Sequence, residues 1–277
     1  MITSSMLLSV LTFVYFGIFM VYLLNFLLKN RLSFFPSVLL LLTTLLHGFA
    51  IVLRWIESYK LGYGRAPFTT LYESLIFYSW LMGALYLLIE WRIKSKVIGM
   101  FVTPLTFLAL AYASFSKDIN KTIQPLIPAL KSNWLIAHVI TCFVGYAAFA
   151  ISFVVCIIYL FKRKAENSAQ FSLIPSKGIL EEINYNMVVI GFISLSLGII
   201  TGSIWANVAW GSYWSWDPKE TWSLITWLVY ATVLHARLTR GWRGKRLAIL
   251  SIVGFLCVLF TYFGVNLLPG LHSYATM

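Results

Sequence analysis

Residues 134–161 read WLIAHVITCFVGYAAFAISFVVCIIYLF, a run of 28 residues without a single Asp, Glu, Lys or Arg. A helix of about 20 apolar residues, rising about 1.5 Å per residue, is enough to cross the hydrocarbon core of a bilayer. The run is therefore long enough to span a membrane, and it predicts an integral membrane protein.

The composition of the whole chain agrees with this prediction. Of its 277 residues, 60% are apolar and only 11% are charged, whereas a soluble domain carries about 25% charged residues. The net charge of +12 would suggest nucleic acid in a soluble protein. In a membrane protein, basic residues collect in cytoplasmic loops, so we expect the lipid bilayer as a partner and no nucleic acid.

The apolar runs predict about eight transmembrane helices and an all-α fold. They form a polytopic integral membrane helical bundle, read as one domain over residues 1–277. The predicted spans are 6–28, 36–56, 71–90, 97–115, 134–161, 186–206, 221–238 and 247–267.

Basic residues predict the orientation of these spans. The 21 Lys and Arg residues divide 14 to 7 between two alternating sets of loops. The richer set is Lys29, Arg31, Arg92, Lys94, Lys96, Lys162, Arg163, Lys164, Lys177, Arg237, Arg240, Arg243, Lys245 and Arg246. The poorer set is Arg54, Lys60, Arg65, Lys117, Lys121, Lys131 and Lys219. The positive-inside rule places the richer set in the cytoplasm, so both termini are expected outside.

The three cysteines, Cys142, Cys156 and Cys257, all lie inside apolar runs. The chain contains no Cys-x-x-Cys pair and no Cys-x-x-Cys-His motif. Thiol redox chemistry and covalent haem attachment to this chain are therefore not predicted.

The most informative stretch is 205–227, WANVAWGSYWSWDPKETWSLITW, which holds six of the eleven tryptophans. An interfacial aromatic belt accounts for one or two tryptophans at a helix end. It does not account for Trp210, Trp214 and Trp216 between two spans. The stretch from about 205 to 222 predicts an outer loop that offers a flat apolar platform to a large planar aromatic ligand.

Asp217-Pro218 predicts the start of the next helix, with Lys219 and Glu220 in its first turn. Asp at the N-cap and Pro at the first helical position form a strong helix start. Capping alone would explain Asp217. A helix N-terminus that attracts polar ligand groups, such as propionates, is the other interpretation.

The chain has four histidines, His47, His138, His235 and His272. His138 and His272 fall on the predicted outer side, where they flank the tryptophan-rich stretch, and two neutral imidazoles suit bis-axial ligation of haem iron. His235 lies near the inner end of its span. The length of that helix, at about 1.5 Å per residue, separates His235 from the outer histidines by about 25 Å. If it binds haem, it would therefore serve a second, inner site. His47 has no evident partner.

These residues resemble a known family. The run WGSYWSWDPKETW at 210–222 is similar to the tryptophan-rich WWD signature of the CcsA/ResC family, the system II cytochrome c biogenesis proteins of bacteria and chloroplasts. The segments RAPF at 65–68, LYESL at 71–75 with Trp80, and YATVLHAR at 230–237 resemble that family too. The resemblance covers nearly the whole chain.

The resemblance implies haem handling for covalent attachment to apocytochrome c. His138 and His272 match the axial ligands of an outer site, and His235 matches a membrane histidine that binds haem at an inner site. The remaining expected contacts to a non-covalent b-type haem in transit are Trp210, Trp214, Trp216, Asp217 and Trp222.

The resemblance also implies partners and a location. A CcsB/ResB-type membrane protein would complete a holocytochrome c synthase, with apocytochrome c bearing Cys-x-x-Cys-His and thiol-reducing proteins acting beside it. The expected location is the bacterial inner membrane, or the thylakoid membrane for organellar relatives. No catalytic residue is predicted, and Glu73 and Asp217 are candidates for an acid or base only by elimination.

Two other functions stay open at this point. A transporter without haem would be expected to show repeats and midplane charges, but the sequence has no evident repeat and its charges lie near helix ends. A haem b subunit of an electron-transfer complex would place paired histidines deeper, on facing helices. Haem absorbance and the phenotype of a deletion strain distinguish these functions.

Overall fold

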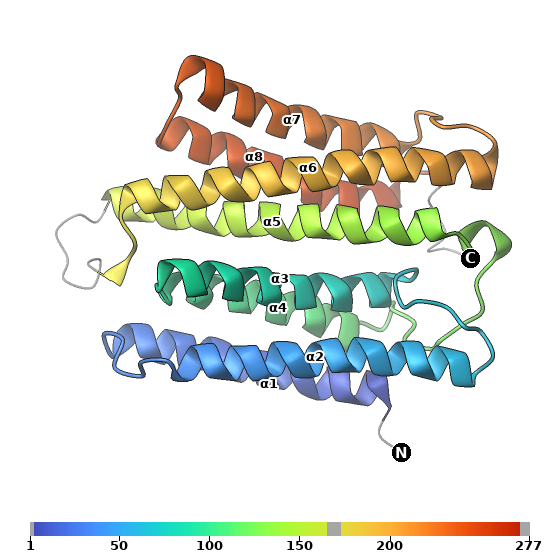
Figure 1. The fold of residues 1–277 in the computed structure, drawn as a ribbon, viewed down its shortest axis with the longest axis horizontal. Coiled ribbons are helices and arrows are strands. Elements are labelled where there is room, and N and C mark those ends of the chain that lie inside the picture. Colours follow the sequence, from blue (N-terminus) through green and yellow to red (C-terminus); the bar gives the residue numbers. More distant parts are fainter. Residues whose placement is uncertain (1–2, 165–172, 272–277) are drawn as a thin grey trace. The chain divides into compact units, whose positions relative to one another are not determined.

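The computed structural model describes residues 3–164 and 173–271, and within that part of the chain all regular structure is helical (Figure 1). The α-helices are α1 (Ser4–Leu27), α2 (Phe35–Lys60), α3 (Leu71–Ile93), α4 (Val97–Phe115), α5 (Asn133–Lys164), α6 (Lys177–Trp210), α7 (Pro218–Arg240) and α8 (Lys245–Tyr262). Short 3-10 helices, η1 (Pro128–Leu130) and η3 (Gly264–Leu267), lie beside α5 and α8. The all-α prediction is confirmed.

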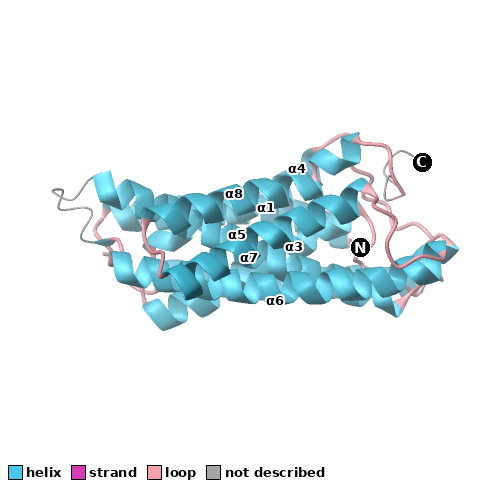
Figure 2. Cartoon of the chain, turned by 90° about the horizontal axis from the view of Figure 1, so that it is seen from above, coloured by secondary structure: helices cyan, strands magenta, loops and turns pink. Residues whose placement is uncertain are grey.

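The helices belong to two compact units, which divide between Ile127 and Pro128. In unit 1, which holds α1 to α4, both α1 and α3 pack against α2 and α4. In unit 2, which holds α5 to α8, both α5 and α7 pack against α6 and α8. The longest helices, α5 with 32 residues and α6 with 34, run side by side in unit 2 (Figures 1 and 2).

The "Arg end" of unit 1 is where α1 and α3 begin and α2 and α4 end. The "Trp end" of unit 2 is where α5 and α7 begin and α6 and α8 end.

Seven of the described helices, all except α7, are long and apolar enough to cross a membrane. Helix α7 has 23 residues but contains Lys219, Glu220, Arg237 and Arg240, so its crossing stays a prediction. Many large apolar side chains are exposed, among them Phe13, Leu42, Leu45, Leu88, Ile200 and Leu256. A soluble monomer rarely exposes so much apolar surface, whereas a bilayer covers it. The polytopic membrane fold is confirmed.

Three predicted boundaries are wrong. Helix α6 begins at Lys177 rather than 186, because Ser176 caps it and its polar first turns bury Leu180 and Ile183. Helix α2 extends to Lys60 rather than 56, so Arg54 and Lys60, which the sequence analysis counted among the loop residues, both belong to the helix. Helix α8 ends at Tyr262, and the chain continues as η3.

Candidate functional site

His138 lies in the first turns of α5 with its ring against α6. Its Nδ1 lies 2.7 Å from the carbonyl oxygen of Gly198. A carbonyl only accepts, so Nδ1 carries the proton of this hydrogen bond and the ring's lone pair is on Nε2. An Nδ1–H bond to a backbone carbonyl is the arrangement that fixes the tautomer and orientation of metal-ligating histidines.

Two glycines of α6, one turn apart, allow the ring to lie there. A Cβ atom added at Gly202 would lie 2.5 Å from His138 Nδ1 and 2.8 Å from Cε1. A Cβ atom added at Gly198 would lie 2.5 Å from Sγ of Cys142. Because real Cβ atoms do not approach other atoms so closely, both positions require glycine for α5 and α6 to hold their present distance.

Aromatic side chains surround the imidazole within unit 2. The ring of Trp205 is stacked near it, with centroids 6.4 Å apart and planes 16° apart. Trp205 is buried, and its Nε1 donates to the carbonyl of Ala129 at 2.9 Å. Trp210 packs edge-on against Trp205, with centroids 4.8 Å apart. His138 therefore lies beside the start of the tryptophan-rich loop.

Glu220 fixes the backbone of that loop. Gly211 ends α6 with φ of 82°. Further along, Oε2 of Glu220 accepts from Ser215 N at 2.8 Å, from Ser215 Oγ at 3.1 Å and from Asp217 N at 3.2 Å. Trp216 lies between these two anchored residues and has φ of 59°, which is unusual for a residue with a side chain.

The tryptophan rings do not form one flat platform, which corrects the sequence-based expectation. Trp214 and Trp216 are perpendicular, at 90° with centroids 5.7 Å apart, so they cannot both stack on one planar ligand. Trp216 is 69% exposed. Trp222 instead packs on Phe260 of α8, with centroids 4.1 Å apart, and so supports the helix pair behind the loop.

Asp217 is the N-cap of α7, with Pro218 in its first turn, as predicted. Its carboxylate accepts from Lys219 N at 2.9 Å through Oδ1 and from Leu271 N at 2.6 Å through Oδ2. A Cβ atom at Gly270 would lie 2.5 Å from Oδ2. Asp217 therefore ties the chain that follows η3 to the base of the tryptophan-rich loop. His272 itself lies outside the described residues.

His235 lies far along α7 from this loop, and its side chain is exposed. Leu228, Thr232 and Thr239 are exposed as well, and their spacing of four, three and four residues places them on one face of the helix with His235. His235 therefore lies on the exposed face of α7, near the end of that helix that is opposite the Trp end.

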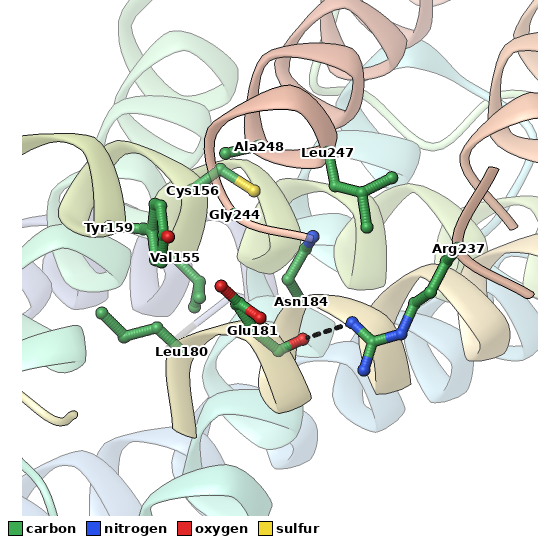
Figure 3. Close-up of a pocket in the computed structure, with 10 residues that line it drawn as sticks. All are labelled: Val155, Cys156, Tyr159, Leu180, Glu181, Asn184, Arg237, Gly244, Leu247 and Ala248. Atoms are coloured by element: carbon green, nitrogen blue, oxygen red, sulfur yellow. Dashed lines mark hydrogen bonds between the residues drawn. The ribbon is translucent and has the colours of Figure 1, made fainter. Parts of the chain in front are cut away.

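Arg237, two residues after His235, points toward Glu181 of α6 within unit 2 (Figure 3). Its NH1 donates to the carbonyl of Glu181 at 3.1 Å, and its Cζ lies 4.1 Å from the ring centroid of Tyr185. The adjoining pocket, of about 10 Å³, has room for a water molecule and not for a macrocycle. A haem ligand at His235 would have to lie on the exposed face of α7.

His47 lies in unit 1 and is fully buried in α2. Its Nδ1 lies 3.2 Å from the hydroxyl of Tyr15. No group of three His, Cys, Asp or Glu side chains suited to a metal ion occurs in the described ranges, so nothing there suggests a metal centre built from the protein alone.

Sequence reasoning gave no role to Gly198, Gly202, Glu220 and Leu271. The two glycines carry a weak signal, since small residues one turn apart often mark close helix packing. Glu220 carries a clearer one, because Glu at the third helical position after Asp forms a capping box. The backbone N–H of Leu271 carries none.

Comparison with known proteins gives the family. The model described as "Cytochrome C assembly protein" matches residues 68–272. The "Cytochrome c biogenesis protein CcsA" of Chlamydomonas reinhardtii is 42% identical over 247 residues, covering 86% of this chain and 68% of the relative. The chain belongs to the CcsA family.

Other CcsA relatives match over a similar length. The one from Prochlorococcus marinus is 41% identical over 275 residues, covering 89% of this chain and 85% of the relative. The one from Guillardia theta is 42% identical over 248 residues, covering 80% and 79%. The chain is thus a multi-pass membrane protein of cytochrome c biogenesis.

The family match has informative limits. Residues 68–272 include three of the four histidines and the whole tryptophan-rich loop. They leave out His47 and Arg54 of α2. The family match therefore gives no information about His47 and Arg54, and only their contacts in unit 1 describe them.

Proposed function

We propose that this CcsA protein holds haem at the Trp end of unit 2, with His138 and His272 as the two axial ligands, and presents it to apocytochrome c. The Nδ1–H bond from His138 to Gly198 carries the proposal, because it leaves the lone pair on Nε2. The tie between Asp217 and Leu271 supports it further, because it anchors the residue next to His272 at the same loop.

The Trp end faces outward on this proposal. The opposite end of unit 2 carries the basic side chains of the turn between α7 and α8, namely Arg240, Arg243, Lys245 and Arg246. Such clusters mark the cytoplasmic side. Both chain termini then lie outside, in the space where cytochromes c receive haem.

Aromatic rings would hold the macrocycle from its edge and face. Since Trp214 and Trp216 are perpendicular, one can stack on the haem while the other borders it. Trp210 packs against Trp205, which is the ring next to His138. Asp217 is engaged by two backbone N–H groups, so its role is to position the loop and the segment before His272.

The chemistry at this site is mainly positional. Each thiol of the Cys-x-x-Cys-His segment adds its S–H across one haem vinyl group, forming a C–S bond and a C–H bond with no net transfer of electrons. Holding the haem with its vinyl groups toward the incoming peptide supplies effective concentration. Thiol-reducing proteins would keep the cysteines in the thiol form, and the chain would act as one component of a holocytochrome c synthase.

Haem would reach the Trp end from an inner site at His235. That side chain is on the exposed face of α7, where a second membrane protein can contact it. An intramembrane ionisable side chain for which residues 3–164 and 173–271 supply no partner points to a shared site. A CcsB/ResB-type protein that contributes another ligand fits this position.

The axial-ligand proposal is tested by His138→Ala and His272→Ala. Each variant should retain less haem, its spectrum should shift from low spin toward high spin, and cytochrome c should no longer mature. Added imidazole should restore part of the activity by filling the open coordination position. His235→Ala should instead leave the outer site low spin but underfilled. Wild-type maturation in both His138→Ala and His272→Ala would show that the proposed mechanism is wrong.

A further inference from the structure

Unit 1 contains a buried charge cluster that the proposed function does not use. We call Arg54, Arg65, Glu73 and Tyr72 the Arg–Glu cluster. Arg54 comes from the last turns of α2, Arg65 from the segment that joins α2 to α3, and the other two from the start of α3. All four are buried, with exposed fractions of 1%, 6%, 1% and 0%.

Glu73 joins the two guanidinium groups, and most of its hydrogen bonds are to Oε2. Its Oε1 accepts from Nε of Arg54 at 3.1 Å. Its Oε2 accepts from NH1 of Arg65 at 2.7 Å, and also from the backbone and hydroxyl groups of the Thr69–Thr70 cap. A carboxylate oxygen has about two acceptor positions, so Oε2 of Glu73 has no capacity for further donors, and Oε1 is bound to Nε of Arg54 alone.

Three donors of the cluster remain unpaired within residues 3–164 and 173–271. They are NH2 of Arg54, NH2 of Arg65 and the hydroxyl of Tyr72, all buried and without a hydrogen-bond partner there. The two guanidinium groups are close, because both bind the same carboxylate. Arg54 also lies over the Tyr72 ring, with Cζ 4.7 Å from the centroid. Buried donors left unpaired, charged ones above all, are costly.

The charges do not balance either. Two buried cations face one carboxylate in direct contact. The next carboxylate, Glu57, binds the backbone N–H and hydroxyl of Ser4 instead, and it forms no ion pair with Arg54 or Arg65 in the described ranges. Among groups in direct contact, the cluster therefore has two cations to one carboxylate, and its unpaired N–H and O–H donors are the complement of an oxyanion.

We propose that the Arg–Glu cluster binds an oxyanion, a phosphate or carboxylate group, through the NH2 atoms of Arg54 and Arg65 and the hydroxyl of Tyr72. Guanidinium forks bind such groups with two parallel hydrogen bonds. The cluster lies at the Arg end of unit 1, which the topology expected from the basic loops of the sequence places at the outer membrane surface. Two molecules carry the required group to that depth, a phospholipid through its phosphate and haem through its propionates.

The experiment uses the full chain purified with its membrane partner in mild detergent. Native mass spectrometry measures retention of added phosphatidylglycerol, and absorbance measures retention of haem and of haem dimethyl ester. Tyr72→Phe removes only the unpaired hydroxyl. Arg54→Lys keeps the charge opposite Glu73 and removes the fork. Lys60→Gln, an exposed cation on the same helix, is the matched control.

Both cluster variants should lower retention of one oxyanion at least threefold, while Lys60→Gln leaves it unchanged. A loss of phosphatidylglycerol with haem unchanged identifies a lipid phosphate. If the variants lose haem, and wild type and variants bind haem dimethyl ester equally weakly, the oxyanion is a haem propionate. Tyr72→Phe and Arg54→Lys should not shift the haem from low spin toward high spin, as His138→Ala should. A failure of the oxyanion proposal can therefore be distinguished from a failure of the axial-ligand proposal. If Tyr72→Phe and Arg54→Lys retain both molecules like wild type, the site does not exist.

Discussion

Gly202→Ala is the most direct test of where His138 lies. The added Cβ atom would be 2.5 Å from Nδ1, and ordinary van der Waals contact begins at 3.4 Å, so the ring or the helix must retreat by about 0.9 Å. Overpacking of this kind costs about 1–3 kcal/mol. A retreat of the ring also weakens the Nδ1–H bond to Gly198, which contributes about 0.5–1.5 kcal/mol net.

The functional loss should exceed the stability loss. A misplacement of about 1 Å in a reacting group can lower a rate by about 10²-fold, and an axial ligand displaced from iron no longer holds it low spin. We therefore expect Gly202→Ala to reach the membrane at near-normal levels. It should retain less haem, with more high-spin character, and should support about 10²-fold less cytochrome c maturation. Haem absorbance, pyridine haemochrome content and cytochrome c staining measure these quantities.

Gly178→Ala is the matched control. It makes the same change on the same helix, but no atom lies within 4 Å of the added Cβ. It should match wild type, or gain up to about 1 kcal/mol from helix propensity. If Gly202→Ala and Gly178→Ala retain equal amounts of low-spin haem, the ring that touches Gly202 is not an iron ligand.

Three other predictions concern the loop, its anchor and the topology. Trp214→Ala with Trp216→Ala should lower haem retention while the amount of protein in the membrane stays normal; unchanged haem would favour a purely interfacial role. Asp217→Ala should remove the helix cap, which contributes about 0.5–2 kcal/mol, and should lower both the melting temperature and the haem content. A variant with a lowered melting temperature but full haem content would exclude a positioning role for Asp217. Reporter fusions after residue 165 should be active only in the cytoplasm and fusions after residue 275 only outside, and the reverse pattern would invert the site.

Local signals predicted much of this protein correctly. Apolar runs located the helices, because each span must bury its own backbone hydrogen bonds in lipid. Asp217 and Pro218 were read correctly as the start of α7, because capping depends on neighbouring residues. The same signals failed at the start of α6, where the first turns are polar and still helical.

Contacts between residues far apart in the chain could not be predicted from the sequence. The sequence analysis counted Arg54 as a loop charge, yet it is buried in α2 and paired with Glu73 of α3. Without Arg54, the count of basic loop residues changes from 14 against 7 to 14 against 6, and the predicted orientation is unchanged. The tautomer of His138 depends on Gly198, 60 residues away. No local pattern contains either contact, since both arise only when separate helices pack.

The backbone of Trp216 connects the fold of the loop to its use. A left-handed conformation with φ of 59° costs a residue with a side chain about 1–2 kcal/mol relative to glycine. Glu220 holds the residues on both sides through Ser215 N and Asp217 N, so the helix start of α7 sustains the strained conformation. An interfacial anchor needs no such strain, because a ring on a regular helix end reaches the membrane surface equally well. On the proposed function, the strained backbone would direct the Trp216 ring away from the helix end and toward the bound ligand.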